Sequence, residues 1–117
     1  MPLQMENDRG VIVIQNEVLA KIAGMAATRC YGVVGMTTRK GKNGLAHLLL
    51  GESVTKGIAI STQNECLTID LHIMVEYGVN INAICESIVN NVKYSIENIS
   101  GFKVGKVNVH VEGARVD

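Results

Sequence analysis

Histidines and carboxylates on two predicted strands are the side chains whose types could do chemistry together. His72 alternates with Asp70 along one patterned segment, and His110 alternates with Glu112 along another. Two imidazoles and one carboxylate are a known ligand set for a divalent transition metal. These residues lie on separate strands without a diagnostic ligand spacing, however, and His47 lies in neither strand. We therefore expect structural or solvent-facing histidines, with no metal and no cofactor.

A basic, glycine-rich stretch over residues 37–44, TTRKGKNG, could contact an anion. Residues 41–44 match the GxxG loop with which KH domains clamp a nucleic-acid backbone. Arg39, Lys40 and Lys42 would supply the charge. The residues before the loop lack the helical pattern of a KH domain, and one Phe and three Tyr are too few for a stacking platform. Nucleic-acid or anion contact through this loop is the alternative to a purely solvated loop.

The nucleophilic side chains show no catalytic context. Cys30, Cys66 and Cys85 are odd in number and form no CxxC pair, so neither a disulfide framework nor a zinc knuckle is predicted. Each lies in an apolar pattern, which favours a buried and unreactive thiol. No serine lies in a GxSxG motif. The sequence therefore predicts a protein that is not an enzyme.

Composition indicates the class of molecule. The chain has 117 residues, 47% of them hydrophobic, which suits one folded domain without a disulfide or metal. Eleven basic and eleven acidic side chains give zero net charge, which argues against a general nucleic-acid or anionic-membrane binder. No apolar run reaches the ~20 residues that cross a bilayer, and no signal peptide is evident. We expect a cytoplasmic protein without direct membrane insertion.

Hydrophobic periodicity predicts the elements that position these residues. The first is a continuous β-branched run, VIVI, typical of a strand buried on both faces. Two long segments have the apolar spacing of amphipathic helices, and two adjacent segments alternate as a hairpin that turns at Asn64 and Glu65. In order, the elements are strand 11–14, helix 16–30, hairpin 56–63 and 66–77, helix 80–99 and strand 104–112.

Helix ends and faces follow from the same pattern. Asn16 is placed to cap the first helix, and either Asn80 or Asn82 the second. The apolar stripe of the first helix is expected to consist of Val18, Ile22, Met25 and Ala26, with Leu19 and Ala23 beside it. The small residues of this helix should let it lie close against a sheet: Ala20, Gly24, Ala26 and Ala27. After this helix, residues 33–34 are expected to begin a short strand.

This order of elements predicts an α+β fold, a two-layer β-α-β-β-α-β domain with two long helices packed on one face of a mixed or antiparallel sheet. Residues 11–14 are expected at the sheet centre. An extra loop and a short helix are expected near residues 37–51. The predicted boundaries are a flexible N-terminus at 1–8, a single domain at 9–113 and a tail at 114–117.

The sheet face away from the helices then needs a cover. A central strand 11–14 would place two isoleucines there, and residues 45–50 are the segment available to fold over them. Aliphatic side chains on an open sheet face predict a contact surface for a second copy or a partner protein. The residues expected in this interface are Ile12, Ile14, Met74, His72 and His110.

Four segments carry a family resemblance: NEVLAKIAGMAATRCYGVVGM, KGIAIS, LTIDLHIMVEYGVNI and NISGFKVGKVNVHVEG. Together they resemble the bacterial alkaline shock protein family, also called the envelope stress response family, over residues 9–113. The closest likeness is to its small, single-domain Gram-positive branch. The resemblance implies a cytoplasmic protein of envelope or alkaline stress homeostasis, some members being recruited to the membrane by an anchor protein. With the contact surface above, it favours a non-enzymatic adaptor that binds itself and another protein, a membrane anchor or a kinase-like neighbour. The alternative is an accessory protein to a dihydroxyacetone-kinase-like fatty-acid kinase. The resemblance implies no catalytic residues.

Overall fold

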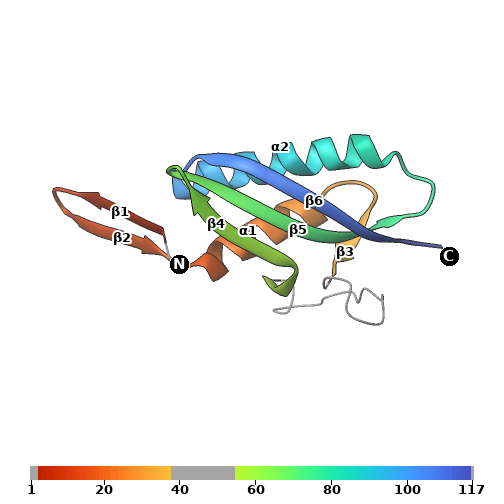
Figure 1. Ribbon diagram of the computed structural model, residues 1–117, viewed down its shortest axis with the longest axis horizontal. Helices are drawn as coiled ribbons and strands as arrows, with labels where there is room; N and C mark the ends of the chain where they lie inside the picture. The colour runs from red at the N-terminus through yellow and green to blue at the C-terminus, as the bar shows by residue number, and fades with distance from the viewer. Residues whose placement is uncertain (1–2, 38–54, 117) are drawn as a thin grey trace.

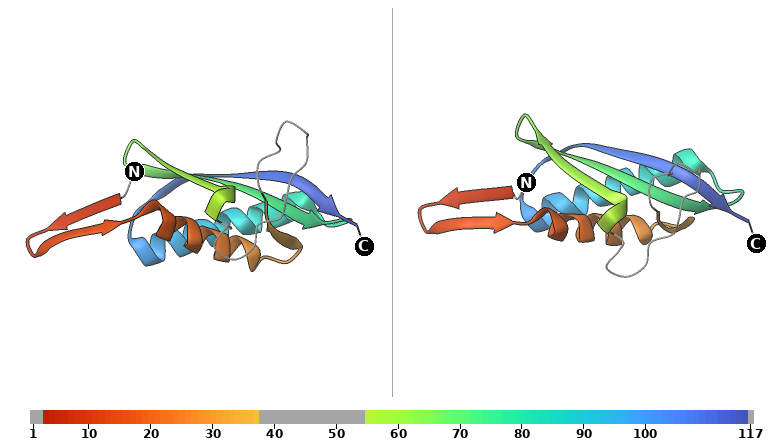
Figure 2. Two further views of the ribbon diagram at one scale, coloured as in Figure 1. Left: turned by 90° about the horizontal axis from the view of Figure 1, so that it is seen from below. Right: turned by 60° about the horizontal axis from the view of Figure 1, so that its bottom comes forward.

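The computed structural model describes residues 3–37 and 55–116. Within them, both helices lie on one face of a four-stranded mixed sheet, and a separate two-stranded hairpin projects from the domain (Figures 1 and 2). The predicted α+β class is confirmed. In chain order the elements are β1 (Leu3–Asn7), β2 (Gly10–Ile14), α1 (Asn16–Thr28), β3 (Val33–Met36), β4 (Ile58–Gln63), β5 (Cys66–Glu76), α2 (Ile81–Ser100) and β6 (Val104–Arg115).

Strand β5 is the centre of the sheet because alternate residues along it are all aliphatic. One edge of β5 pairs antiparallel with β4 and, further along, with β3. The other edge pairs parallel with β6, which returns to the sheet after the α2 crossover. The side chains that β5 buries toward the helices are Leu67, Ile69, Leu71, Ile73 and Val75.

The β4–β5 connection is the predicted two-residue hairpin. Asn64 and Glu65 both have positive φ, 50° and 67°, as a type I′ turn requires. The turn sets the register in which Gln63 faces Cys66 and Ile58 faces Leu71. This prediction from alternation is therefore confirmed.

Of the two asparagines predicted as caps of helix α2, Asn80 is the one that caps it. The Asn80 side chain accepts a hydrogen bond from the Ala83 backbone N–H at 3.1 Å, and Gly101 ends the helix in the left-handed conformation with φ 80°. Its buried stripe lies against the sheet and consists of Ile84, Ile88, Val92 and Ile96.

Helix α1 differs from prediction in its cap and its buried face. Gln15, rather than Asn16, occupies the N-cap position, and its side chain makes no capping hydrogen bond. Val18 and Met25 are exposed. The small residues expected to allow close packing are buried, so the buried face lies to one side of the predicted stripe: Leu19, Ala20, Ala23, Gly24, Ala26 and Ala27.

The expected central position of residues 11–14 is wrong. Strand β5 pairs directly with β6, so the sheet has no place between them for a further strand. Residues 11–14 belong instead to β2, which pairs with β1 in the hairpin at the left of Figure 1. A β-branched run favours a strand but does not specify its partner, and the α2 crossover brings β6 directly beside β5. Strand β1 lies in the segment for which the sequence predicts a flexible terminus, and the extra loop and helix expected near 37–51 lie, beyond Thr37, outside the described residues.

Candidate functional site

The most exposed apolar surface of a strand is on the hairpin β1–β2, residues 3–14, which we call the arm. Val11, Ile12 and Val13 keep 49%, 50% and 49% of their surface exposed. Ile14, at the base of the arm, packs against the core. Successive strand residues point to opposite faces, so Ile12 and its two valine neighbours leave aliphatic surface uncovered on both faces of β2.

A second group of functional candidates lies on β5 and β6, on the sheet face away from the helices. We call it the His cluster, because His72 and His110 stack with their ring centroids 4.6 Å apart. His72 Nδ1 lies 3.1 Å from Glu112 Oε1, and His110 Nε2 lies 3.4 Å from Asp70 Oδ1. Asn108 Nδ2 also donates to Asp70 Oδ1 at 3.0 Å. The cluster thus joins the two parallel strands through side chains.

The orientation of the two rings in the His cluster decides whether the cluster could bind a ligand. The stacked rings face each other, and the bonded nitrogen of each ring meets a different carboxylate. In residues 3–37 and 55–116, no group of three or more His, Cys, Asp or Glu side chains is placed to hold a metal ion. The arrangement is suited to holding β5 against β6 rather than to converging on one ligand.

The five residues expected in one interface fall in two places. Ile12 and Ile14 lie on the arm, whereas Met74, His72 and His110 lie on the four-stranded sheet. Met74 is half-buried, and His72 is only 6% exposed. The structure therefore brings Met74 and the histidines onto one sheet but separates them from the arm.

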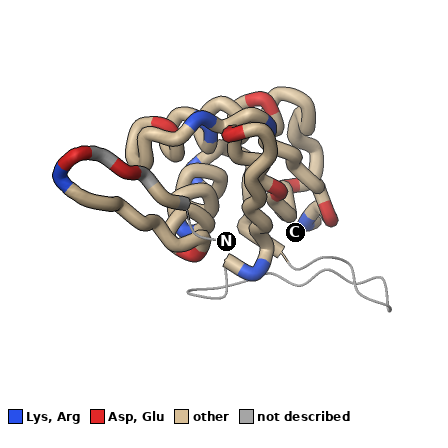
Figure 3. The backbone as a smooth tube through the Cα atoms, turned by 60° about the vertical axis from the view of Figure 1, so that its left-hand side comes forward, with Lys and Arg blue, Asp and Glu red and all other residues tan. Residues whose placement is uncertain are grey.

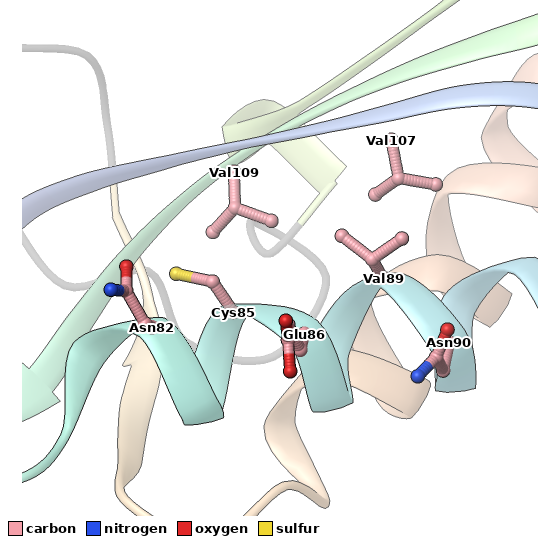
Figure 4. Close-up of a pocket in the computed structure, with 7 residues that line it drawn as sticks. All are labelled: Asn82, Cys85, Glu86, Val89, Asn90, Val107 and Val109. Atoms are coloured by element: carbon pink, nitrogen blue, oxygen red, sulfur yellow. The ribbon is translucent and has the colours of Figure 1, made fainter.

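A groove lies between α2 and β6 (Figure 4). The hydrophobic pattern of the sequence does not predict it. Its volume is about 670 Å³. Val107 and Val109 project from β6 toward Cys85 and Val89 of α2, and the polar rim consists of Asn82, Glu86 and Asn90. Burial raises the pKa of the Cys85 thiol. Valines from both elements form the floor of the groove, but its accessible lining is more polar than apolar because of the rim.

The three cysteines are free thiols, and only Cys30 is buried as expected, whereas Cys66 and Cys85 are partly exposed. Cys30 is buried where α1 ends against α2, and its sulfur accepts hydrogen bonds from Asn91 Nδ2 at 3.1 Å and Ser87 Oγ at 3.7 Å. This contact fixes the crossing of the two helices.

Several predicted candidates lie outside the described residues. They include the cationic side chains of the glycine-rich loop, the remaining histidine and the segment expected to cover the sheet: Arg39, Lys40, Lys42, His47 and residues 45–50. In the part of the chain that is described, no helix has the length and apolar character needed to cross a membrane.

A sequence model of the alkaline shock protein 23 family, described as having a cell envelope-related function, matches residues 4–116, which include nearly all of the arm. The chain belongs to this family. It is 37% identical to the uncharacterised YloU of Bacillus subtilis over 117 residues, covering 99% of this chain and 98% of that protein. The predicted resemblance to the alkaline shock family is confirmed.

Other relatives come from Streptococcus pyogenes. The chain is 29% identical to the uncharacterised Spy1614 over 117 residues, which are 99% of this chain and 97% of that protein. It is 28% identical over 103 residues to a stress response regulator gls24 homolog, covering 88% of this chain and 58% of the relative. No solved structure matches the chain.

Proposed function

We propose that this member of the alkaline shock family is a non-enzymatic cytoplasmic adaptor in cell-envelope stress homeostasis, and that it binds other protein chains through its arm. The observation that carries the proposal is the half-exposure of Val11, Ile12 and Val13 on a hairpin that projects from the domain (Figure 1). Its partners would be a second copy and a membrane-anchor or kinase-like protein, and it would reach the membrane through such a partner.

Contact with another chain would give the arm a stability that it lacks alone. An isolated two-stranded hairpin is only marginally stable in water. Full burial of a Val or Ile side chain is worth about 1.5–3 kcal/mol, so covering the exposed halves of three such side chains would contribute roughly 2–4 kcal/mol. This gain alone corresponds at best to millimolar affinity, so stable binding also requires further contacts with the partner.

The absence of catalysis is supported by the way in which reactive side chains are used. Cys30 is buried and holds the helix crossing, and the raised pKa of Cys85 disfavours its thiolate. His72 and His110 are engaged with each other and with carboxylates. Cys30 and the two histidines therefore have structural roles, and the thiol of Cys85 is poorly suited to act as a nucleophile.

Affinity purification from the producing bacterium, comparing two charge variants, tests the adaptor function. Ile12→Glu adds a charge to the arm, whereas Met25→Glu adds the same charge to exposed helix α1, where the native side chain is similarly accessible at 56%. We expect stoichiometric protein partners with the wild type and with Met25→Glu, and their loss with Ile12→Glu. Unfolding by urea should show that both variants remain folded.

Two outcomes would contradict the proposal. One is equal recovery of partners by the Ile12→Glu variant. The other is salt-sensitive recovery of RNA in place of protein, abolished by Arg39→Ala, Lys40→Ala and Lys42→Ala together, which would assign function to the basic loop.

A further inference from the structure

The edge of the sheet beside the α2–β6 groove is open. In the described chain, β6 is paired only with β5, so the backbone groups on its outer edge are not used by another strand. Val107 and Val109 alternate with exposed Asn108 along this edge and line the groove on one side. An open strand edge next to a groove with valines on its floor is a surface on which an additional strand can be recognised: its backbone pairs with the edge and alternate side chains enter the groove.

The arm has the features of such an additional strand. Strand β2 pairs with β1 on one edge only, and its sequence, GVIVI, is rich in β-branched residues. Its five residues span about 17 Å at ~3.4 Å per residue, which fits along the 12 residues of β6. Both partners in the contact are therefore strands with a free edge and aliphatic alternate residues.

In this structure the arm does not contact the α2–β6 groove of the same chain. It leaves the domain from the start of α1 and points away from the sheet, while the groove lies along the first half of α2 and the middle of β6 (Figures 1 and 2). The molecule is correspondingly long, 55 × 29 × 25 Å. Both surfaces thus remain available to a second copy at the same time.

Charge also favours contact between identical copies. The net charge of the chain is zero, so two copies approach without net repulsion. The arm carries charges of both signs (Figure 3). Glu6 and Asp8 are exposed near its tip, and Lys106 is exposed on β6. Opposite charges can therefore meet when the arm lies along β6.

We propose that the arm of one copy adds to the free edge of β6 in a second copy, with alternate β2 side chains covering the α2–β6 groove. This contact rests on the proposed role of the arm in binding protein chains. It adds that the bound chain is a second copy and that the arm binds at the α2–β6 groove. Because the arm and the groove are different surfaces, the contact is head-to-tail and repeats from copy to copy.

Disulfide trapping between two differently tagged variants tests this contact. One carries Cys66→Ser and Cys85→Ser together with a new cysteine on the arm, at Val11, Ile12 or Val13 in turn. The other carries Cys66→Ser and keeps Cys85 in the groove. Adjacent strand residues point to opposite faces, so only one face of β2 can point toward Cys85. Mixed disulfides should therefore form either at position 12 or at positions 11 and 13. The yield on the favoured face should exceed that on the other face by about fivefold or more.

Met25→Cys in place of the arm cysteine is the matched control, because Met25 is also exposed but lies on α1. It should give no disulfide with Cys85 above background. Lack of trapping at all three arm positions would overturn the proposal, and so would equal trapping at positions 11, 12, 13 and 25. If trapping fails while Ile12→Glu still abolishes partner recovery, the adaptor function stands and only the arm–groove contact is wrong.

Complementation of two charge variants gives a second readout in solution. Ile12→Glu impairs the arm but leaves the groove, whereas Val109→Glu impairs the groove but leaves the arm. Each should be monomeric by sedimentation, and their equimolar mixture should form a one-to-one dimer, because only one arm–groove contact remains. If Val109→Glu does not fold, Asn90→Arg on the exposed rim replaces it. A mixture that stays monomeric, or single variants that assemble as the wild type does, would contradict the contact.

Discussion

His72 and His110 lie directly opposite each other in the parallel β5–β6 ladder, and their rings stack at 4.6 Å with the planes inclined by only 15°. Each ring bonds a carboxylate of the other strand: His72 reaches Glu112 on β6, and His110 reaches Asp70 on β5. The four side chains therefore cross-link the two strands in both directions. Parallel pairs are slightly less stable per residue than antiparallel ones, so this cluster supports the weaker ladder of the sheet.

The two histidines should differ in their contribution to stability. His72→Ala should lower the free energy of unfolding by about 1–3 kcal/mol, because it leaves the largely buried Glu112 carboxylate without this imidazole. His110→Ala should cost less than about 1 kcal/mol, since its side chain is 47% exposed. Urea unfolding of both single variants and the double variant measures the costs and their coupling. Equal costs for the two single variants would contradict a larger structural role for His72.

Elements with a strict period could be predicted from the sequence. Strand β5 alternates over its 11 residues, and α2 repeats isoleucine and valine at helical spacing over its 20 residues. In both cases one face is buried by the same core, so the sequence pattern and the tertiary contacts agree. The cap could be narrowed to Asn80 or Asn82 because an Asn before an apolar-periodic run is a local signal, and the structure selects Asn80.

The arm shows what periodicity cannot supply. Val11 to Ile14 is a continuous apolar run, which normally indicates burial on both faces, yet only its end, Ile14, is partly buried against the core. A local signal for the hairpin was present: Asn7, Asp8 and Gly10 are turn formers around the connection between β1 and β2. The groove could not be predicted in this way, because it exists only where Val109 of β6 meets Cys85 of α2 across the fold.

The β4–β5 turn offers a stabilising substitution. Glu65 has φ 67° without being glycine, a conformation that is strained for most residues. We expect Glu65→Gly to raise the free energy of unfolding by roughly 0.5–1 kcal/mol, because glycine adopts positive φ without a side-chain clash. Urea unfolding provides the measurement, and Glu65→Ala is the control because it removes the same side chain but keeps a Cβ. Stabilisation by alanine equal to that by glycine would show that the side chain, rather than the backbone, is responsible.

Two glycines with the same backbone angle separate conformational strain from packing. Gly32 and Gly78 both have φ +87°. A Cβ at Gly78 meets nothing within 4 Å, whereas a Cβ at Gly32 would overlap with Ile84 Cδ1 of α2. Gly78→Ala should therefore cost about 1 kcal/mol from strain alone, and Gly32→Ala about 1–3 kcal/mol more from overpacking. Thermal or urea unfolding tests this order, and equal losses would mean that Ile84 moves aside without cost.

The raised pKa of the Cys85 thiol predicts how the stability of the protein depends on pH. Burial raises its pKa above the ordinary value of 9.0, so the folded state holds the thiol proton more tightly than the unfolded state does. The protonated thiol thus contributes stability that is fully present below the pKa of Cys85 in the unfolded state. This contribution is lost as the pH rises through the pKa of Cys85 in the folded state. From about pH 8 to pH 10.5, the free energy of unfolding should therefore fall more steeply for the wild type than for Cys85→Ala. Alkylation of Cys85 by iodoacetamide should likewise accelerate at a higher pH than alkylation of a cysteine in a short unfolded peptide. Identical pH profiles for the protein and the peptide would show that the groove does not desolvate this thiol.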